Sequence, residues 1–424
     1  MHCRIVLSLT FILKPPSLTL CSLQNPNDRG TQQAEDRATR VLRIAVCHSE
    51  PGAWHAPVPR YHTTRCPPPA PKNNLGKKGK KGKKGKKGKR GEREVEYHQY
   101  TIGRTMFETD SLPSGWNERL SYVDEIWVPT DFSADIFRKS MAELPSPAND
   151  NNENANTNTN KPRSSSINSS GSGSGSGSSV VVVGEPVDTD FFSPQDVSEA
   201  TAIGLPTSLS ALSAPLAQGR TVLLFVGKWE DRKGIRTLIR AFCAAFKSPK
   251  PSAEDTENRP VLAILTSAYH STADFQAEIA QILREEGEGG DQRLDKGGGS
   301  HSDSGRSDIL LLSKVRQQHM PLLYSIASVL VVPSSGEGWG RPHVEAMACG
   351  TPVIATYWSG PTAYLTEENG YPLKLDLDMD MVNMDNKDNK NNKENHGLVP
   401  AGPWNGHRYV VSIVYILYSL VSYD

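Results

Sequence analysis

The sequence predicts an α/β protein with parallel sheets, and two observations carry this prediction. Apolar runs such as TVLLFVG (221–227) alternate along the chain with segments whose apolar residues recur at helical spacing, such as GIRTLIRAFCAAF (234–246). A continuous apolar run is typical of a strand that helices cover on both faces of a parallel sheet. Strands that alternate with helices therefore predict repeated βα units.

The individual elements follow from the same patterns in chain order. We expect strands at residues 41–49, 97–105, 125–130, 179–188, 221–227, 261–267, 309–315, 328–334 and 351–360. We expect helices at residues 115–124, 132–140, 234–246, 319–327 and 342–349. In the last helix, Pro342 suits the first helical position and Gly350 suits the position after the helix ends.

Four polar stretches interrupt this pattern and are predicted to be disordered. They are a Pro-rich segment followed by a Gly-Lys-Lys repeat (67–94), an Asn-rich and Gly-Ser-rich segment (145–179), a Gly-rich segment (286–306), and a run of Asp, Asn and Lys (376–396). Because all of them lie between patterned segments, we interpret them as long surface insertions.

The formal net charge of zero hides an uneven distribution. The chain has 424 residues with 47 basic and 47 acidic side chains, and residues 72–93 hold twelve of the basic ones and one of the acidic ones. The rest of the chain is therefore acidic. Such a cationic tract predicts nonspecific contact with a polyanion such as RNA, DNA or anionic lipid, although it lacks aromatic residues that would stack on bases.

Both ends of the chain carry apolar runs. Residues 1–13 have an early Arg and a short apolar stretch, as a signal peptide has, but Lys14 and Pro15 end the run and no small-residue cleavage site follows. The apolar tail at 409–423 is shorter than the roughly 20 residues that span a bilayer. We predict a cytoplasmic protein, with the secretory pathway as the alternative. The six cysteines show no disulfide or zinc spacing, and Cys243 and Cys349 are expected to be buried.

The first motif with chemical content is GKWEDRKG, from Gly227 to Gly234. It joins a predicted buried strand to a helix, so Lys228 and Lys233 lie at the edge of the sheet where ligands bind. Two cations across such a turn can converge on a diphosphate. The alternative is that both lysines are solvated on a surface turn.

The second motif is PSSGEGWGRPHVEAMACGTPVIA, at 333–355. Gly336, Gly338 and Gly340 would let the backbone approach a ligand, and the helix that starts near Pro342 would favour an anion. Carboxylates in such loops accept hydrogen bonds from ribose hydroxyls. The alternatives are a solvated loop acid for Glu337 and, for Glu345, a residue that only complements the helix dipole.

Together these blocks resemble the retaining GT-B glycosyltransferases of family 4 (glycosyl transferases group 1). EGWGRPHVEAMACGTPVIAT resembles the family's paired-glutamate signature, and FVGKWEDRKGIRTLIRAF resembles its block of glycine, basic residue, spacer and Lys-Gly. EPVDTDFFSP (185–194) resembles its interdomain segment. IGRTMFETDSLPSGW and DEIWVPTDF resemble the amino-terminal domain of a eukaryotic branch. The resemblance covers about residues 41–144, 180–247, 261–285 and 308–374.

The resemblance implies a fold and a reaction. Family members have two Rossmann-like domains that face a cleft, and they transfer a sugar from a nucleotide-sugar donor with retention of anomeric configuration and without a metal. The donor would be UDP- or GDP-linked, with no further cofactor, and the acceptor would be a glycan, a lipid or a protein. We predict a hexosyltransferase-type enzyme. An inactive nucleotide-sugar-binding protein of the same fold and a polyanion-binding protein are the alternatives.

The resemblance also assigns roles to individual residues. Lys228 and Lys233 would neutralise the diphosphate, although the first of these positions is more often Arg in the family. Glu337 would contact the transferred sugar, and these three residues form the predicted catalytic set. The predicted donor-binding residues are Gly227, Gly338, Trp339, Gly340, Arg341 and Glu345, the last of them through the ribose hydroxyls. His48, Arg104 and Glu108 are candidates for the acceptor side, with structural roles as the alternative.

The domain boundaries predicted from these matches divide the chain into four parts. Residues 1–40 are unassigned or a signal, 41–200 form a partial amino-terminal acceptor-side domain, 201–375 form the donor-binding domain, and 376–424 hold a disordered segment and an atypical tail. The amino-terminal part lacks the strand and Gly-rich loop that open the family's first domain. We therefore expect a chain that is truncated in its amino-terminal domain.

Overall fold

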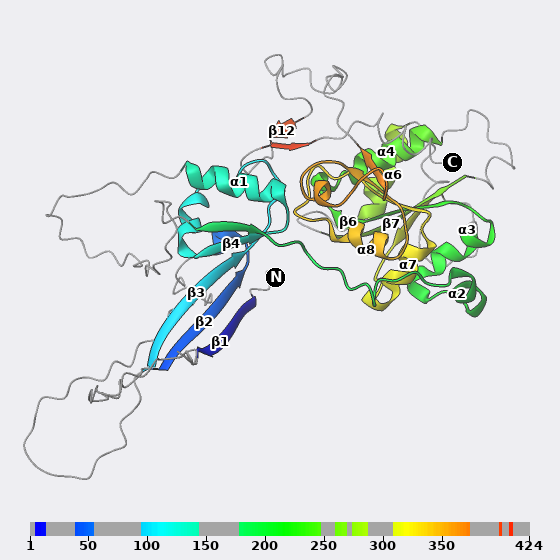
Figure 1. The fold of residues 1–424 in the computed structure, drawn as a ribbon. Helices are drawn as coiled ribbons and strands as arrows, with labels where there is room; N and C mark the ends of the chain where they lie inside the picture. Colours follow the sequence, from blue (N-terminus) through cyan, green and yellow to red (C-terminus); the bar gives the residue numbers. More distant parts are fainter. Residues whose placement is uncertain are drawn as a thin grey trace, which may run out of the picture. The chain divides into compact units, whose positions relative to one another are not determined.

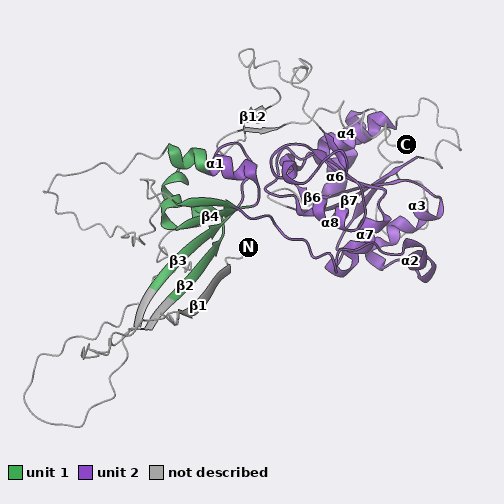
Figure 2. Ribbon diagram, in the orientation of Figure 1, with its two compact units in different colours: residues 1–105, 115–128, 138–181 green, residues 106–114, 129–137, 182–424 purple. Residues whose placement is uncertain are grey.

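The computed structural model describes residues 5–13, 39–54, 95–143, 178–246, 259–268, 274–286, 308–373, 398–400 and 407–409. The predicted disordered stretches and the apolar tail fall almost entirely outside these residues. The described residues divide into two compact units (Figures 1 and 2). Unit 1 comprises residues 1–105, 115–128 and 138–181, and unit 2 comprises residues 106–114, 129–137 and 182–424.

Unit 1 is built on a five-stranded sheet with the order β1-β2-β3-β4-β5. Its strands are β1 (Ile5–Leu13), β2 (Thr39–His48), β3 (Val95–Arg104), β4 (Glu125–Val128) and β5 (Ser179–Val182). The short helices η1 (Pro51–Ala53) and η2 (Asn117–Tyr122) belong to this part of the chain, and α1 (Asp131–Ala142) is divided between the units. β2, β3 and β4 pair in parallel, whereas β1 pairs antiparallel with β2.

The apolar run at the start of the chain forms a strand. Residues 5–13 form β1 at the edge of the sheet, where β1 pairs antiparallel with β2, while β2, β3 and β4 are parallel to one another. A short apolar run is compatible with a strand, a helix or a signal peptide, and periodicity alone does not separate them. Cys47 on β2 is disulfide-bonded, contrary to the expectation from cysteine spacing.

The core of unit 1 forms around the fully buried Trp54. Its indole lies on β3 at Gly103, where a Cβ would lie 2.3 Å from the Cη2 atom of Trp54. The indole Nε1 donates to Ser49 Oγ at 3.2 Å. Glycine at position 103 is therefore required for the indole to cover the strand.

Unit 2 contains a six-stranded sheet whose described pairs are all parallel, with the order β11-β10-β9-β6-β7-β8. The strands are β6 (Val222–Trp229), β7 (Val261–Ala268), β8 (Ile309–Leu312), β9 (Val329–Val332), β10 (Val353–Thr356) and β11 (Tyr371–Leu373). Numbered along the chain from β6 and read from β8, the order is 3-2-1-4-5-6, which is the Rossmann order.

Helices accompany both faces of this sheet. They are α2 (Val197–Ile203), η3 (Thr207–Leu212), α3 (Ser213–Ala217), η4 (Asp231–Lys233), α4 (Ile235–Ala245), α6 (Phe275–Glu285), η5 (Gln317–His319), α7 (Met320–Ile326), α8 (Arg341–Ala348) and η6 (Gly360–Ala363). The short strands β12 (Leu398–Pro400) and β13 (His407–Tyr409) pair antiparallel. The α/β class predicted from the sequence is confirmed.

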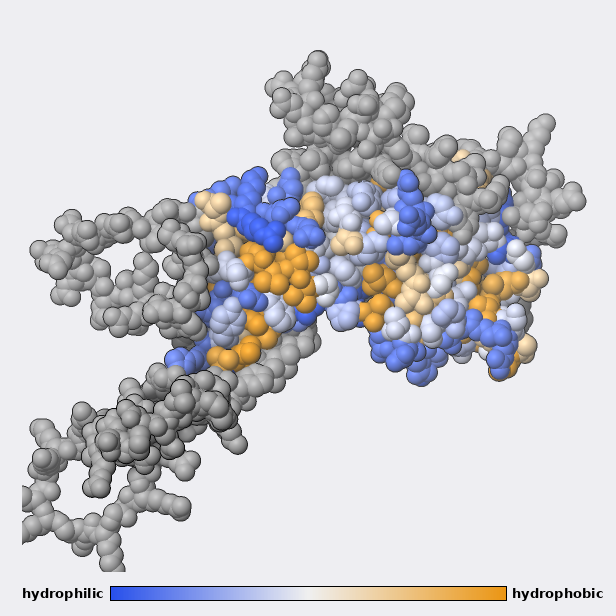
Figure 3. All heavy atoms as spheres, in the orientation of Figure 1, coloured by the Kyte–Doolittle hydropathy of each residue, from blue (hydrophilic) through white to orange (hydrophobic). Residues whose placement is uncertain are grey.

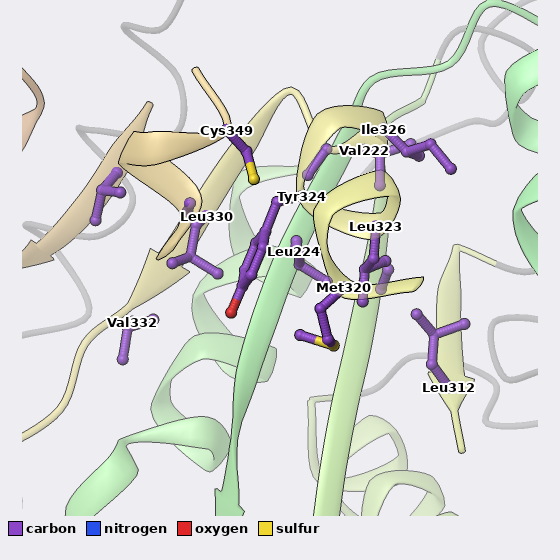
Figure 4. Packing of buried hydrophobic residues seen from close by; sticks show 14 of the residues in the cluster. Val222, Leu224, Leu312, Met320, Leu323, Tyr324, Ile326, Leu330, Val332 and Cys349 are labelled. Atoms are coloured by element: carbon purple, nitrogen blue, oxygen red, sulfur yellow. The ribbon is translucent and has the colours of Figure 1, made fainter. Parts of the chain in front are cut away.

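Two hydrophobic clusters form the core of unit 2, one on each face of the sheet. Along β6, Leu223 and Phe225 join the cluster under α4 and α6, whereas Val222 and Leu224 join the cluster under α7 and α8. Alternate residues of a strand point to opposite faces, so a run that is apolar at every position can fill both clusters. Figure 4 shows part of the second cluster, with Tyr324 of α7 between Leu224 and Leu330.

The surface is mixed in character. Figure 3 shows small hydrophobic groups separated by hydrophilic residues on the face that it draws. The exposed large hydrophobic residues are Tyr122, Val181, Val182, Phe191, Ile203 and Tyr371. Among the described residues, no helix is both long enough and apolar enough to cross a membrane.

Candidate functional site

The two loops that carry the sequence motifs leave the carboxyl ends of neighbouring strands. β6 and β9 pair in parallel, and the chain runs outward from them in opposite directions, through β7 to β8 and through β10 to β11. Ligands of open α/β sheets bind at such a switch point, outside the carboxyl ends of the strands. The topology therefore places both motifs where a ligand is expected.

A glycine brings the two loops together. Gly234 has a φ of 68° and ends the short helix η4. A Cβ at this position would lie 2.2 Å from the carbonyl oxygen of Pro333 in the second loop. A second contact is the hydrogen bond from the backbone N–H of Ser335 to the carbonyl of Arg232, at 2.7 Å. Both the left-handed conformation and the close approach require glycine.

The backbone of Glu337 is fixed from the other side by residues 359 and 360. Its N–H donates to Ser359 Oγ at 2.8 Å, and Ser359 Oγ donates to the Glu337 carbonyl at 3.0 Å. The Gly360 N–H donates to the same carbonyl at 2.8 Å. Ser359 is fully buried and has a φ of 59°, a conformation that costs energy for a residue other than glycine.

The side chains of Lys233 and Glu337 form the centre of the site. Lys233 Nζ donates to Glu337 Oε1 at 2.6 Å and to Oε2 at 2.8 Å. Arg232 supports this pair, because its Nη1 lies 3.5 Å from Glu337 Oε2 and donates to the Gly336 carbonyl at 2.6 Å. The predicted catalytic residues Lys233 and Glu337, which are 104 positions apart, are thus in direct contact.

Electrostatics keep Glu337 ionised despite its burial. Burial alone would raise the pKa of the Glu337 carboxyl, but attraction by the Lys233 ammonium and the Arg232 guanidinium outweighs it and lowers this pKa from 4.5 to about 2. The carboxylate is charged at neutral pH and can accept hydrogen bonds from a ligand's hydroxyl groups.

Glu345, the second glutamate of the motif, lies on α8. The phenol of Tyr324 donates to Glu345 Oε2 at 3.0 Å, and Arg341 Nε lies 3.4 Å from Oε1. Burial and the charge of Glu345 raise the pKa of the Cys349 thiol to about 11. Glu345 is therefore held by two partners on its own side of the sheet, while Arg341 itself is largely exposed.

Gly227 and Lys228 lie near the carboxyl end of β6, just before its last residue, Trp229. In the parallel register, Gly227 lies opposite Thr266 and Lys228 opposite Ser267 of β7. The Lys228 side chain is exposed at the carboxyl end of the strand. It has the solvent access that binding a diphosphate requires, whereas Lys233 is mostly buried against Glu337.

The glycines of the second loop accommodate other parts of the protein. A Cβ at Gly336 would lie 2.5 Å from the carbonyl oxygen of Glu108, and a Cβ at Gly338 would lie 2.8 Å from the Cγ and Sδ atoms of Met106. The sequence predicts that these positions admit a ligand. In the structure, the side of the loop where each Cβ would project is closed by the segment 106–114, which belongs to unit 2.

Aromatic side chains surround the end of this loop. A Cβ at Gly340 would lie 2.6 Å both from His343 Nδ1 and from the Tyr364 hydroxyl, which donates to the Trp339 carbonyl at 2.7 Å. His343 Nδ1 lies 3.1 Å from the Gly340 carbonyl, so it carries the proton that this acceptor needs. Burial lowers the pKa of His343 to about 4, and the imidazole is neutral.

The three acceptor-side candidates are found in different units. His48 and Arg104 end the neighbouring strands β2 and β3 of unit 1, where they are register partners. Glu108 belongs to unit 2, and its Oε1 lies 3.5 Å from Arg232 Nη2. Burial raises the pKa of the Glu108 carboxyl, although the attraction of Arg232 opposes this effect.

Sequence reasoning missed several residues of this site. Arg232 contacts Glu337 and Glu108, and its position next to Lys233 in the same motif was a signal that could have indicated it. Tyr324 and Met106 had no such signal, because they reach the site from distant segments. Among the described residues, no group of three or more His, Cys, Asp or Glu side chains is placed to hold a metal ion.

Comparisons with known proteins identify relatives of part of the chain. Residues 220–381 match the model of the family "Glycosyl transferases group 1". The D-inositol 3-phosphate glycosyltransferase of Nocardioides sp. is 30% identical over 189 residues, which cover 44% of this chain and 36% of that protein. The O-antigen chain mannosyltransferase B of Escherichia coli is 29% identical over 133 residues, covering 31% and 28%. The matched parts thus span about a third of the length of these relatives.

Solved structures show weaker likeness. The Anabaena protein HepE in complex with UDP and glucose has a TM-score of 0.39 at 16% identity, covering 65% of this chain and 57% of that chain. An alpha,alpha-trehalose-phosphate synthase from Burkholderia xenovorans in complex with glucose-6-phosphate has a TM-score of 0.40 at 13% identity, covering 62% and 55%.

The family match coincides with the sheet that carries the site. It includes β6 to β11, both motif loops and the pair of Lys233 and Glu337. The relatives named here are bacterial, so the eukaryotic branch and the truncation inferred from the sequence stay predictions. The similarity to the glycosyl transferases group 1 family thus extends over residues 220–381 of this chain.

Proposed function

We propose that this protein is a glycosyltransferase that moves a sugar from a UDP- or GDP-linked donor to a glycan, lipid or protein acceptor. The transfer retains the anomeric configuration and needs no metal ion. One observation carries the proposal above the others. The switch point of the unit 2 sheet holds an ionised, buried Glu337 in contact with Lys233, within a segment that matches a glycosyltransferase family. The names of the relatives support the same reaction class.

The charges of the site suit the departure of a nucleoside diphosphate. Cleavage of the glycosidic C–O bond develops negative charge on the leaving phosphate, and Lys228 and Lys233 stabilise that charge more in the transition state than in the ground state. Lys233 must then share its ammonium between Glu337 and the phosphate. Arg232 makes this exchange feasible, since it stays paired with Glu337 when Lys233 turns toward the phosphate.

The remaining predicted residues take positions around that leaving group. In the proposal, Glu337 accepts hydrogen bonds from the transferred sugar and Glu345 accepts them from the ribose. The backbone from Gly338 to Arg341, which leads into α8, meets the phosphate or the sugar, and Gly227 leaves room beside β6.

Binding of nucleotides to the full chain tests the proposal directly. We expect UDP, GDP or ADP to raise the melting temperature, and Lys233→Ala to lose most of this stabilisation. One charge-assisted contact is worth roughly 1.5–3 kcal/mol, so the nucleotide affinity should fall at least about tenfold. Lys139→Ala, which removes an exposed lysine of α1, is the matched control. A protein that none of the three nucleotides stabilises would contradict the proposal.

Assays on the same protein distinguish two alternative functions from this proposal. A nucleotide-sugar-binding protein without activity would bind the donor. It would not release the nucleotide or transfer the sugar, whether the assay contains EDTA or Mg²⁺. The Lys-rich tract at 72–93 favours a polyanion-binding function, and it lies outside the described residues. Polyphosphate binding that disappears when this tract is deleted, together with no nucleotide binding, would favour that function.

A further inference from the structure

The segment 106–114 lies along the Glu337 loop in the opposite direction. The backbone carbonyl of Glu108 faces Gly336, and the side chain of Met106 faces Gly338, so the two stretches run antiparallel past each other. Burial alternates along the segment, with positions 105, 107 and 109 buried and positions 106, 108 and 110 partly exposed. The side chains of Met106 and Glu108 therefore share the partly exposed face of the segment.

Glu108 is joined to Glu337 through one guanidinium. Arg232 Nη2 lies 3.5 Å from Glu108 Oε1, and Arg232 Nη1 lies 3.5 Å from Glu337 Oε2. The Glu108 side chain keeps about a third of its surface exposed (32%), whereas that of Glu337 keeps 8%. A molecule bound against Glu337 and Gly338 would therefore meet Met106 and an accessible carboxylate oxygen of Glu108.

The ion pairs around this position contain more acids than bases. Arg232 is shared by Glu108, Glu337 and Glu230, whose Oε1 lies 2.9 Å from Nη2, and Lys233 pairs with Glu337. Three carboxylates thus face two cations in these five side chains. The surplus negative charge disfavours a ligand carboxylate at this place and favours hydroxyl groups, which can donate to the free oxygens.

We propose that Met106 and Glu108 form the sugar-facing wall of the donor site, and that Glu108 selects neutral hexosyl donors over donors whose sugar carries a carboxylate. This inference rests on the proposed function. It assigns the selection of the donor sugar to a segment that is distant in sequence from the two donor motifs. Arg232 acts here as a positioning residue, since it holds the Glu108 and Glu337 carboxylates on one guanidinium.

Calorimetric titration of the full chain tests the charge selection. The ligands are UDP, UDP-glucose and UDP-glucuronate, together with GDP, GDP-mannose and GDP-mannuronate. In the nucleotide series that binds, we expect the neutral donor to bind at least about tenfold more tightly than the acidic one, which equals about 1.4 kcal/mol. Glu108→Gln should reduce this ratio about tenfold and change the affinity for the free nucleotide less than about twofold.

Three variants make the result specific. Glu199→Gln removes an exposed carboxylate of α2 in the same unit and should leave the ratio unchanged, and Glu108→Asp keeps the charge and should keep the preference. Met106→Ala should raise the affinity for UDP-N-acetylglucosamine relative to UDP-glucose, or for the bulkier of two GDP-sugars, because it opens the wall. The melting temperature of each variant checks that it is folded.

The outcomes separate this inference from the proposed function. If neither nucleotide series binds the wild type, the proposed function falls and the inference falls with it. If nucleotide binds but Glu108→Gln leaves the ratio unchanged, or shifts all ligands equally, Glu108 does not face the sugar and the inference alone is overturned.

Discussion

The ion pair of Lys233 and Glu337 should contribute strongly and pH-dependently to the stability of unit 2. Its Nζ–Oε1 distance is 2.6 Å, and the two side chains keep 13% and 8% of their surface exposed. The pKa of Glu337 is lowered from 4.5 to about 2. Because each pKa unit equals 1.36 kcal/mol, the charged form stabilises the folded state by about 3 kcal/mol at pH 7.

The sign of the pH dependence follows from the lowered pKa. The contribution is fully present above the unfolded-state pKa of 4.5, is lost as the pH falls toward 2, and is about 1 kcal/mol near pH 3. Lys233→Met keeps much of the side-chain length but removes the charge, and it leaves a buried carboxylate with Arg232 as a weaker partner. Breaking a buried pair in this way costs about 3–5 kcal/mol at neutral pH.

Urea denaturation at pH 7 and pH 3 measures this effect. We expect the free energy of unfolding of Lys233→Met to fall by about 3 kcal/mol or more at pH 7, and by much less at pH 3. The double variant with Glu337→Gln should recover part of the loss, because it removes the unpaired charge. An equal loss at both pH values would contradict this prediction, since it would show that the cost does not come from the ionised carboxylate.

Three further predictions concern other parts of the chain. Gly103→Ala should destabilise unit 1 by about 1–3 kcal/mol, because its Cβ would lie 2.3 Å from Trp54; tryptophan fluorescence during unfolding reports it. Asp308→Asn should destabilise unit 2 by about 3–5 kcal/mol in urea, because Arg220, whose side chain is 1% exposed, loses its 2.6 Å partner. Tyr324→Phe removes the phenol that donates to a buried carboxylate, so the melting temperature should fall by the equivalent of about 1.5–3 kcal/mol.

The central strands of unit 2 were predictable because they are apolar on both faces. The runs at 221–227, 261–267 and 328–334 correspond to β6, β7 and β9, and each fills the two clusters in alternation. The short helix at 342–349 was indicated by its proline and by the glycine after its end, and α8 spans Arg341–Ala348. In these cases, local pattern and tertiary environment favour the same structure.

Other elements depend on contacts that no local pattern reveals. Helix α6 was not predicted, although Asp274 caps it by accepting from the Ala277 N–H at 3.0 Å. The pairing of Lys233 with Glu337 was expected only as two groups near one ligand. The attachment of Met106 and Glu108 to the Glu337 loop could not be predicted, since glycines at 336 and 338 indicate close approach without naming what approaches.

The division of the chain has a consequence for its synthesis. The segments 106–114 and 129–137 belong to unit 2, but the strand β6 and the loop at 335–340 are made much later. At about 5–20 residues per second, Met106 and Glu108 leave the peptidyl transferase centre roughly 10–45 s before their partners do. During that interval the nascent chain contains Met106 and Glu108 but not the Glu337 loop that they approach. A recombinant fragment that starts at residue 182 would contain this loop without Met106 and Glu108, so the binding of a sugar should be studied on the undivided polypeptide.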